Sequence, residues 1–227
     1  MKINRGLLIA QVVGLFVVFA LLLFGAAGTT SWWAGWWFLI LFFGFVTAIS
    51  LWLLGYNPAL LQERMTGLKS AEKGWDVAIL LAMNAAFLFW LILMPLDAVR
   101  FRWSNVPLVL QLVGEGIMLA SFVLFYLTFR ANSYLSPVVR IQGERGQTVV
   151  STGPYAYVRH PMYAAALLLF VGTSLMLGSW YGVLVGLLLE AGIARRAVLE
   201  EQTLREELQG YEEYQERVRY RLIPHVW

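Results

Sequence analysis

Long apolar stretches separated by short polar links dominate the chain. A helix that crosses a bilayer needs about 20 mostly apolar residues. Four stretches reach that length with no more than one charged residue each: Gly6–Ala27, Trp32–Gly55, Trp75–Leu96 and Pro107–Phe129. We therefore expect four transmembrane helices.

A fifth apolar stretch, Pro161–Leu189, is too long for one straight span. At 1.5 Å per residue it would extend about 43 Å as a helix, whereas the hydrocarbon core is about 30 Å thick. A break at Gly178-Ser179 would give two shorter helices folded as a hairpin. The predicted fold is an all-α polytopic membrane bundle of four spans plus a C-terminal helical hairpin, with no Rossmann domain.

The basic residues predict the orientation of these helices. With the amino terminus inside and the fifth stretch folded as a hairpin, fifteen of the seventeen Lys and Arg residues are cytosolic, as the positive-inside rule favours. A straight fifth span would instead place the six C-terminal arginines outside. We expect a multi-pass protein, of a bacterial inner membrane, with both termini in the cytosol.

Composition supports the membrane assignment and excludes some chemistry. Hydrophobic residues make up 59% of the 227 residues and charged residues 14%, whereas soluble domains have about 45–50% and about 25%. The chain has no cysteine, which excludes disulfides, thiol catalysis and zinc–thiolate sites. The net charge of +3 fits basic residues beside anionic headgroups, so it implies the lipid bilayer and no nucleic acid as partner.

Two polar regions interrupt the pattern of spans and links. One is the loop 130–160, and the other is the C-terminal stretch 195–227. They flank the hairpin and fall on the same side of the membrane, so the hairpin would hold them close together. We accordingly divide the chain into a four-span transmembrane region, residues 1–129, and a catalytic region, residues 130–227.

The loop ends in the run GPYAYVRHPMY, residues 153–163. Pro161 suits the first position of a helix, which would place Arg159 and His160 at a helix N-terminus that attracts anions. The alternative is an ordinary basic cluster at the membrane surface, with Tyr155, Tyr157 and Tyr163 as interfacial aromatics.

Three acids stand out in apolar surroundings. Glu201 falls on the apolar stripe of the predicted C-terminal helix, and Glu200 borders that stripe one turn after Arg196. Because a buried acid is costly unless it is paired, this pair holds either structural arginines or a cationic ligand. Glu115, inside the fourth predicted span, is either functional or a packed, hydrogen-bonded side chain.

Together the motif at 153–163, Arg196, Glu200-Glu201 and the run RLIP at 221–224 resemble the isoprenylcysteine carboxyl methyltransferase family. Phospholipid N-methyltransferases share much of this pattern, and some membrane sterol reductases share it more distantly. The resemblance covers the chain from Asn132 onward. One departure is Ala165, where many relatives have glycine.

The resemblance implies a membrane enzyme that uses S-adenosylmethionine as cofactor and needs no metal. It implies cofactor-binding roles for Tyr155, Arg159, His160, Tyr163, Glu200 and Glu201. It also implies catalytic roles for Arg159, Arg196 and Glu200. The acceptor would be a lipidic or amphiphilic molecule that enters sideways between helices.

The scarcity of bases favours one reaction over its alternatives. A carboxylate acceptor needs no base, whereas an amine must lose a proton, and the chain has only His160 and His225 as histidines. We therefore favour carboxyl O-methylation, with Arg159 or Arg196 orienting the acceptor. Phospholipid N-methylation and small-thiol S-methylation remain open, and a nicotinamide-dependent reductase or a non-catalytic membrane protein fits the sequence less well.

Overall fold

The computed structural model describes residues 3–67, 71 and 73–227 of the chain. Two of the basic residues counted above, Lys2 and Lys69, lie outside these residues. The described residues form helices and no strands, which confirms the predicted helical membrane bundle. The α-helices are α1 (Arg5–Ala27), α2 (Trp33–Tyr56), α3 (Pro58–Thr66), α4 (Gly74–Pro95), α5 (Leu108–Ala131), α6 (Pro161–Met176), α7 (Trp180–Glu207) and α8 (Tyr211–Arg217).

Four of these helices have the length and apolar character needed to cross a membrane. They are α1, α2, α5, and α4 together with the π-helical turn η2 (Leu96–Arg100) that continues it. Their bounds lie within a few residues of the four predicted spans. α6 and α7 form the predicted hairpin, and the turn between them contains Gly178, whose φ of 85° favours glycine. Ser179 then caps α7, because its Oγ accepts a hydrogen bond of 2.8 Å from the Gly182 N–H.

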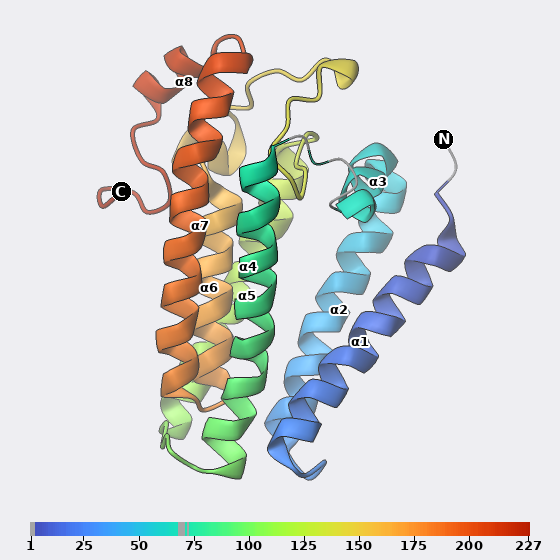
Figure 1. Ribbon diagram of the computed structural model, residues 1–227, viewed down its shortest axis with the longest axis vertical. Coiled ribbons are helices and arrows are strands. Elements are labelled where there is room, and N and C mark those ends of the chain that lie inside the picture. Colours follow the sequence, from blue (N-terminus) through green and yellow to red (C-terminus); the bar gives the residue numbers. More distant parts are fainter. Residues whose placement is uncertain (1–2, 68–70, 72) are drawn as a thin grey trace.

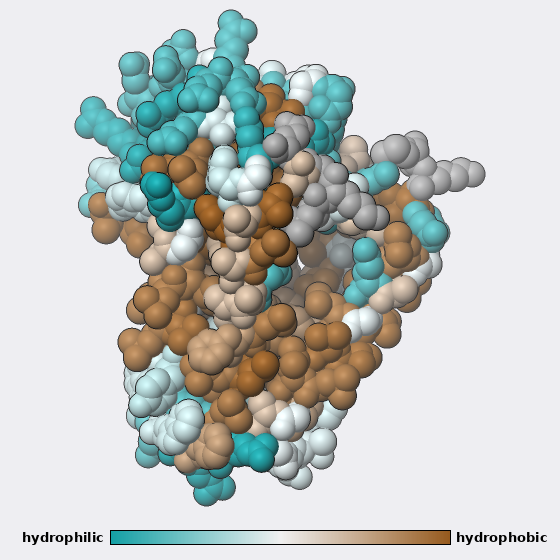
Figure 2. All heavy atoms as spheres, viewed as in Figure 1, coloured by the Kyte–Doolittle hydropathy of each residue, from teal (hydrophilic) through white to brown (hydrophobic). Residues whose placement is uncertain are grey.

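The helices form an upright group, α4 to α7, against which α1 and α2 lean (Figure 1). Both ends of the described chain lie toward the end of the molecule that carries α3 and α8 (Figure 1). Apolar residues form a band around the middle, and hydrophilic residues gather most heavily where α7 ends and α8 begins (Figure 2). We call this region the polar end. The turns of α7 that follow Arg196 project past the apolar band into it.

Glu115 is satisfied by another helix. Its Oε1 accepts a hydrogen bond of 3.0 Å from Nε1 of Trp37, which joins α5 to α2. The side chain lies near the start of α5, at the end of the bundle away from α8. This matches the reading of Glu115 as a packed, hydrogen-bonded acid.

α5 and α6 pack more closely than side chains would allow. A Cβ atom on Gly172 would lie 2.5 Å from the Met118 backbone nitrogen, and a Cβ on Gly114 would lie 2.6 Å from that of Met176. Small residues let membrane helices approach in this way. Because α6 begins at the loop motif, this contact fixes the position of that motif above the bundle.

Gly172→Leu should therefore destabilise the protein, because a side chain there must push α5 and α6 apart. We expect a loss of at least about 1–3 kcal/mol, the usual cost of overpacking, measured as a lower Tm in detergent. Gly44→Leu is the matched control, since a Cβ at Gly44 meets no atom within 4 Å. Equal melting temperatures for the two variants would contradict the close-packing argument.

Candidate active site

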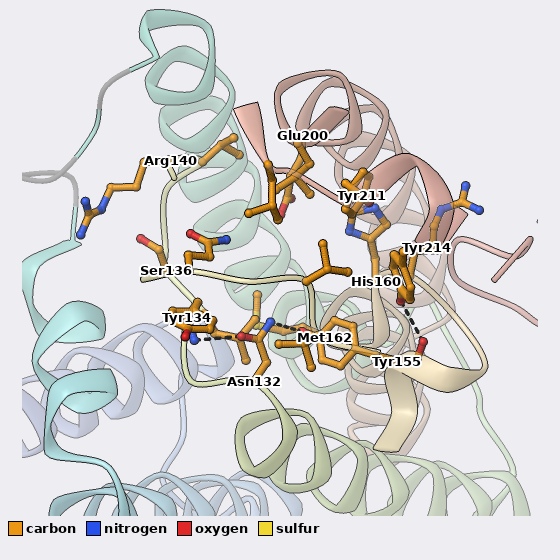
Figure 3. Close-up of a pocket in the computed structure, with 18 of the residues that line it drawn as sticks. Asn132, Tyr134, Ser136, Arg140, Tyr155, His160, Met162, Glu200, Tyr211 and Tyr214 are labelled. Atoms are coloured by element: carbon orange, nitrogen blue, oxygen red, sulfur yellow. Dashed lines mark hydrogen bonds between the residues drawn. The ribbon is translucent and has the colours of Figure 1, made fainter. Parts of the chain in front are cut away.

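A pocket at the polar end lies between the segment 132–150, the start of α6 and the last turns of α7 with α8 (Figure 3). Its walls come from both of the polar regions that the sequence singles out. The residues that line it include Asn132, Tyr134, Ser136, Arg140, Tyr155, Arg159, His160, Met162, Tyr163, Arg196, Glu200, Leu204, Tyr211 and Tyr214. The pocket thus joins parts of the chain that the helical hairpin separates in sequence.

Hydrogen bonds between side chain and backbone shape the floor of the pocket. The Asn132 carboxamide accepts from the Tyr134 N–H at 2.8 Å and donates to the Tyr155 hydroxyl at 3.0 Å. The Tyr214 hydroxyl donates to the Tyr155 carbonyl at 2.8 Å (Figure 3). These bonds tie the end of α5, the 3₁₀ turn η4 (Gly153–Ala156) and α8 together.

A buried ion pair anchors the segment 132–150 to α3. The Arg140 guanidinium donates to both Glu63 carboxylate oxygens, at 3.1 and 3.0 Å, and the Ser136 hydroxyl donates to the same carboxylate at 2.7 Å. Paired geometry of this kind is the strong form of an ion pair. Hydrogen bonding to Arg140 outweighs the effect of burial and lowers the pKa of Glu63.

A second buried pair, Arg196 with Asp76, fixes the wall of the pocket. Asp76 is fully buried at the start of α4, and its carboxylate accepts from Arg196 Nε at 2.7 Å and from the Val139 N–H at 2.7 Å. Arg196 also donates to the Tyr163 hydroxyl at 2.9 Å and to the Pro137 carbonyl at 3.0 Å. All three guanidinium nitrogens of Arg196 are thereby engaged.

Glu201 lies behind the pocket at the centre of a cationic cluster. Its carboxylate accepts from Arg159 Nε at 2.7 Å and from Arg221 Nε at 3.0 Å, and it lies 3.2 Å from His160 Nε2. The side chain is 1% exposed. Burial alone would raise the pKa of Glu201, but the hydrogen bonds from His160 and Arg159 outweigh it and lower the pKa to about 2.

Glu200 lines the pocket and has different partners from Glu201. Its carboxylate accepts a hydrogen bond of 2.5 Å from the Tyr163 hydroxyl. It forms no salt bridge within the described part of the chain, although it lines the cavity. Arg196 reaches Glu200 only through the Tyr163 hydroxyl, to which it also donates, so no cation of the described residues contacts this carboxylate directly.

The predicted site residues come together with one exception. Tyr155, Arg159, His160, Tyr163, Arg196 and Glu200 all line the pocket. Glu201 does not line it, so the structure gives Glu201 a structural setting, and its role as a cofactor ligand stays a prediction. Of the motif tyrosines, Tyr155 and Tyr163 are buried, whereas Tyr157 is 72% exposed.

The anion-binding expectation for the motif also changes. The backbone N–H groups of Arg159 and His160 donate to the carbonyls of Tyr220 and Arg221, each at 2.9 Å. The Arg159 guanidinium donates through Nε to Glu201 and through Nη1 to two carbonyls, those of Val218 and Arg219. The C-terminal segment thus occupies most of this helix start, which leaves Nη2 of Arg159 for a ligand.

Sequence reasoning missed several residues that shape the site, above all Asp76 and the Glu63–Arg140 pair. Asp76 carried a usable signal, because a single acid at the edge of an apolar span requires a cationic partner. Neither Glu63 nor Arg140 stands out in sequence, because each lies in an ordinary polar link. In the described residues, no group of three or more His, Cys, Asp or Glu side chains could hold a metal ion.

Residues 109–209 match the family model for phospholipid methyltransferases (PEMT). The matched segment includes α5, α6, the loop motif and α7, and hence most of the pocket wall. No curated protein matches the chain significantly. The family match supports a membrane methyltransferase and does not single out the isoprenylcysteine carboxyl methyltransferases.

We expect Glu201→Gln to lower stability strongly, because it leaves Arg159 and Arg221 facing a neutral group. Removing one partner of a buried ion pair costs about 3–5 kcal/mol. The loss would appear as a lower Tm in detergent. Glu206→Gln on the exposed face of α7 is the control, and an unchanged Tm in Glu201→Gln would contradict the structural role.

The same carboxylate predicts acid sensitivity. Because the folded pKa of Glu201 is lowered from 4.5 to about 2, its stabilising effect is complete above about pH 4.5 and is lost as the pH falls toward 2. When Tm is measured at pH values from 6 to 3, it should begin to decrease once the pH is below about 4.5. The decrease should be smaller in Glu201→Gln. Equal slopes of Tm against pH for the wild type and Glu201→Gln would refute the assignment.

Proposed function

We propose that the protein is an S-adenosylmethionine-dependent methyltransferase that acts on a lipidic acceptor. The observation that carries this proposal is Glu200, a carboxylate that lines the pocket and forms no direct salt bridge among the described residues. It lies in a segment that matches membrane methyltransferases. S-adenosylmethionine carries an ammonium and a sulfonium, and either cation would neutralise it.

Other pocket groups complement the rest of the cofactor. Nη2 of Arg159 is available for the cofactor carboxylate. Tyr211 lines the pocket, and its hydroxyl is buried without a hydrogen-bond partner in the described residues; an adenine or ribose atom would supply one.

Cofactor entry requires the pocket to open. Its volume is about 100 Å³, below the roughly 300–1,000 Å³ typical of ligand sites. The segment 132–150, tied down by Glu63 and by Asp76, is the part of the wall formed by irregular chain. We therefore infer that this segment moves outward when the cofactor enters.

For the acceptor we propose a carboxylate on an isoprenylcysteine-like lipid. S-adenosylmethionine supplies an already activated methyl group, so the protein has mainly to align the acceptor with it. His160 lines the pocket, but its Nε2 is engaged by the Glu201 carboxylate at 3.2 Å. His225 lies exposed and is not among the residues that line the pocket; its Nδ1 is 3.1 Å from the Tyr220 hydroxyl. We therefore assign neither histidine as a base. A carboxylate acceptor needs no such base.

One observation favours phospholipid N-methylation as the second candidate. The matching family model is that of phospholipid methyltransferases. Glu200 could then accept a proton from the acceptor amine or form an ion pair with it.

We also propose that the polar end faces the cytosol. In the described residues, this end carries the Arg side chains of the segment 130–159, of α3 and of the C-terminal region. The positive-inside rule places such residues in the cytoplasm. Both termini would then be cytosolic.

Calorimetry on the purified protein tests cofactor binding. The wild type should bind S-adenosylmethionine and its demethylated product. Glu200→Gln keeps the hydrogen-bond acceptor for Tyr163 but removes the charge, so we expect weaker binding by about 1.5–3 kcal/mol, the scale of a charged hydrogen bond. Glu206→Gln, on the same helix but exposed, should bind as the wild type does. Absence of binding by folded wild-type protein would end the methyltransferase proposal.

Methyl transfer from radiolabelled S-adenosylmethionine identifies the acceptor chemistry. We expect base-labile label, characteristic of a methyl ester, on S-farnesylcysteine. Base-stable label on phosphatidylethanolamine and none on the carboxylate lipid would favour the second candidate instead.

A further inference from the structure

A second cavity opens in the apolar part of the molecule, outside the pocket described above. It is a groove of about 750 Å³ between α1, α2, α3 and α5. Its walls are mostly hydrocarbon, from side chains such as Leu15, Val18, Phe45, Phe122 and Phe125. The surface is hollowed beside α1 within the apolar band (Figure 2). The groove therefore suits a hydrocarbon chain.

Among the described residues that line this groove, one carries a charge: Arg64, on α3. The Arg64 guanidinium lies 5.0 Å from the centre of the Phe129 ring and is half-buried. It forms no salt bridge with a carboxylate of the described residues. The acid next to it, Glu63, is already paired with Arg140. A cation held at an apolar surface without an anion costs free energy. An anionic ligand would remove this cost for Arg64.

Arg64 also reaches the wall of the methyl-donor pocket. Its Nη1 lies 4.0 Å from the sulfur of Met162, and Met162 lines that pocket. Burial and the charge of Arg196 both lower the pKa of Arg64, which places the two guanidiniums in one electrostatic environment. Met162 thus contacts Arg64 of the groove on one side and lines the pocket on the other, and methionine side chains adapt readily to a ligand.

The other arginines near the donor are already committed. All three nitrogens of Arg196 bond to Asp76, Tyr163 or the Pro137 carbonyl. Arg159 has only Nη2 left, which the proposed function assigns to the cofactor carboxylate. The sequence predicts that one of these two arginines orients the acceptor, but the structure leaves Arg64 as the better-placed cation.

We propose that the groove holds the hydrocarbon tail of the methyl acceptor and that Arg64 binds the acceptor carboxylate. This inference rests on the proposed methyl transfer and names the occupant as a long-chain amphiphile with one terminal carboxylate. Charge complementarity supports that choice, because the groove is mostly apolar and Arg64, the charged side chain among the described residues that line it, contacts Met162 of the pocket wall. A guanidinium matches the planar carboxylate.

The reaction balances without a further reactant. One carboxylate oxygen forms a bond to the methyl carbon, the bond between that carbon and sulfur breaks, and its electron pair stays on sulfur. The products are a neutral methyl ester and a neutral thioether, and no proton is transferred. Arg64 releases the product more easily than it binds the substrate, because the ester has lost its charge.

The first test removes the charge of Arg64. With S-farnesylcysteine as acceptor, Arg64→Gln should lower kcat/KM by about tenfold to a hundredfold, the range for a charged hydrogen bond. Arg64→Lys should recover part of the loss. Affinity for S-adenosylmethionine should stay unchanged, and Tm should fall only slightly, because the substitution breaks no salt bridge among the described residues and mainly loses the contact with the Phe129 ring. Arg217→Gln, an exposed charge removal on α8, should leave kcat/KM unchanged.

The second test fills the groove without touching Arg64. Gly14 lines the groove, and a Cβ there meets no atom within 4 Å, so Gly14→Leu projects into open space. It should raise the KM for S-farnesylcysteine at least severalfold. Gly25→Leu is the matched control on the same helix, because its Cβ also meets nothing and Gly25 is not among the residues that line the groove.

The outcomes separate this inference from the proposed function. Wild-type levels of transfer in both Arg64→Gln and Gly14→Leu, with cofactor binding intact, would overturn the groove and leave the methyltransferase standing. Transfer to phosphatidylethanolamine and not to S-farnesylcysteine would overturn the carboxylate occupant. If the wild type does not bind S-adenosylmethionine, the proposed function itself fails.

Discussion

The pair formed by Asp76 and Arg196 is the constraint on which the site depends. It joins the start of α4 to α7 at full burial, and through its remaining hydrogen bonds it also holds Tyr163 of α6 and the backbone at 137–139. Charges so buried are stable only when each lone pair and each N–H has a partner. Loss of either residue would therefore release a helix contact, the pocket wall and the overlying segment together.

The cluster around Glu201 repeats this arrangement on the other side of the pocket. There one buried carboxylate collects Arg159 and Arg221, and so fastens the C-terminal segment to the start of α6. Both clusters use up their charges internally. Among the residues that line the pocket, they leave Glu200 without a direct salt bridge and the buried Tyr211 hydroxyl without a hydrogen-bond partner in the described part of the chain. The electrostatic character of the pocket is thus set by the polar groups that are not engaged in the two ion-pair clusters.

Helix length and charge distribution made most of the fold predictable from sequence. The four spans and the break at Gly178-Ser179 follow from the thickness of a bilayer and from the position of basic residues. The pocket was also predictable in outline, because the motif at 153–163 and Glu200 flank a hairpin that must bring them together. The division between Glu200 and Glu201 was not, since adjacent residues on a helix differ by about 100° in direction, and only packing decides which one meets the cavity.

The distribution of function along the chain follows from the same packing. Most of the pocket at the polar end lies within the segment that matches the phospholipid methyltransferase model, whereas α1 to α3 supply much of the apolar groove and its arginine. Glu63 and Arg64 are adjacent on α3 but have different contacts. Glu63 anchors the segment over the pocket through Arg140, and Arg64 lines the groove. A short helix thereby couples the two cavities, so that movement of the segment 132–150 during cofactor entry would pull on the element that carries Arg64. In the proposed function, the geometry of acceptor binding would then depend on whether the donor site is closed.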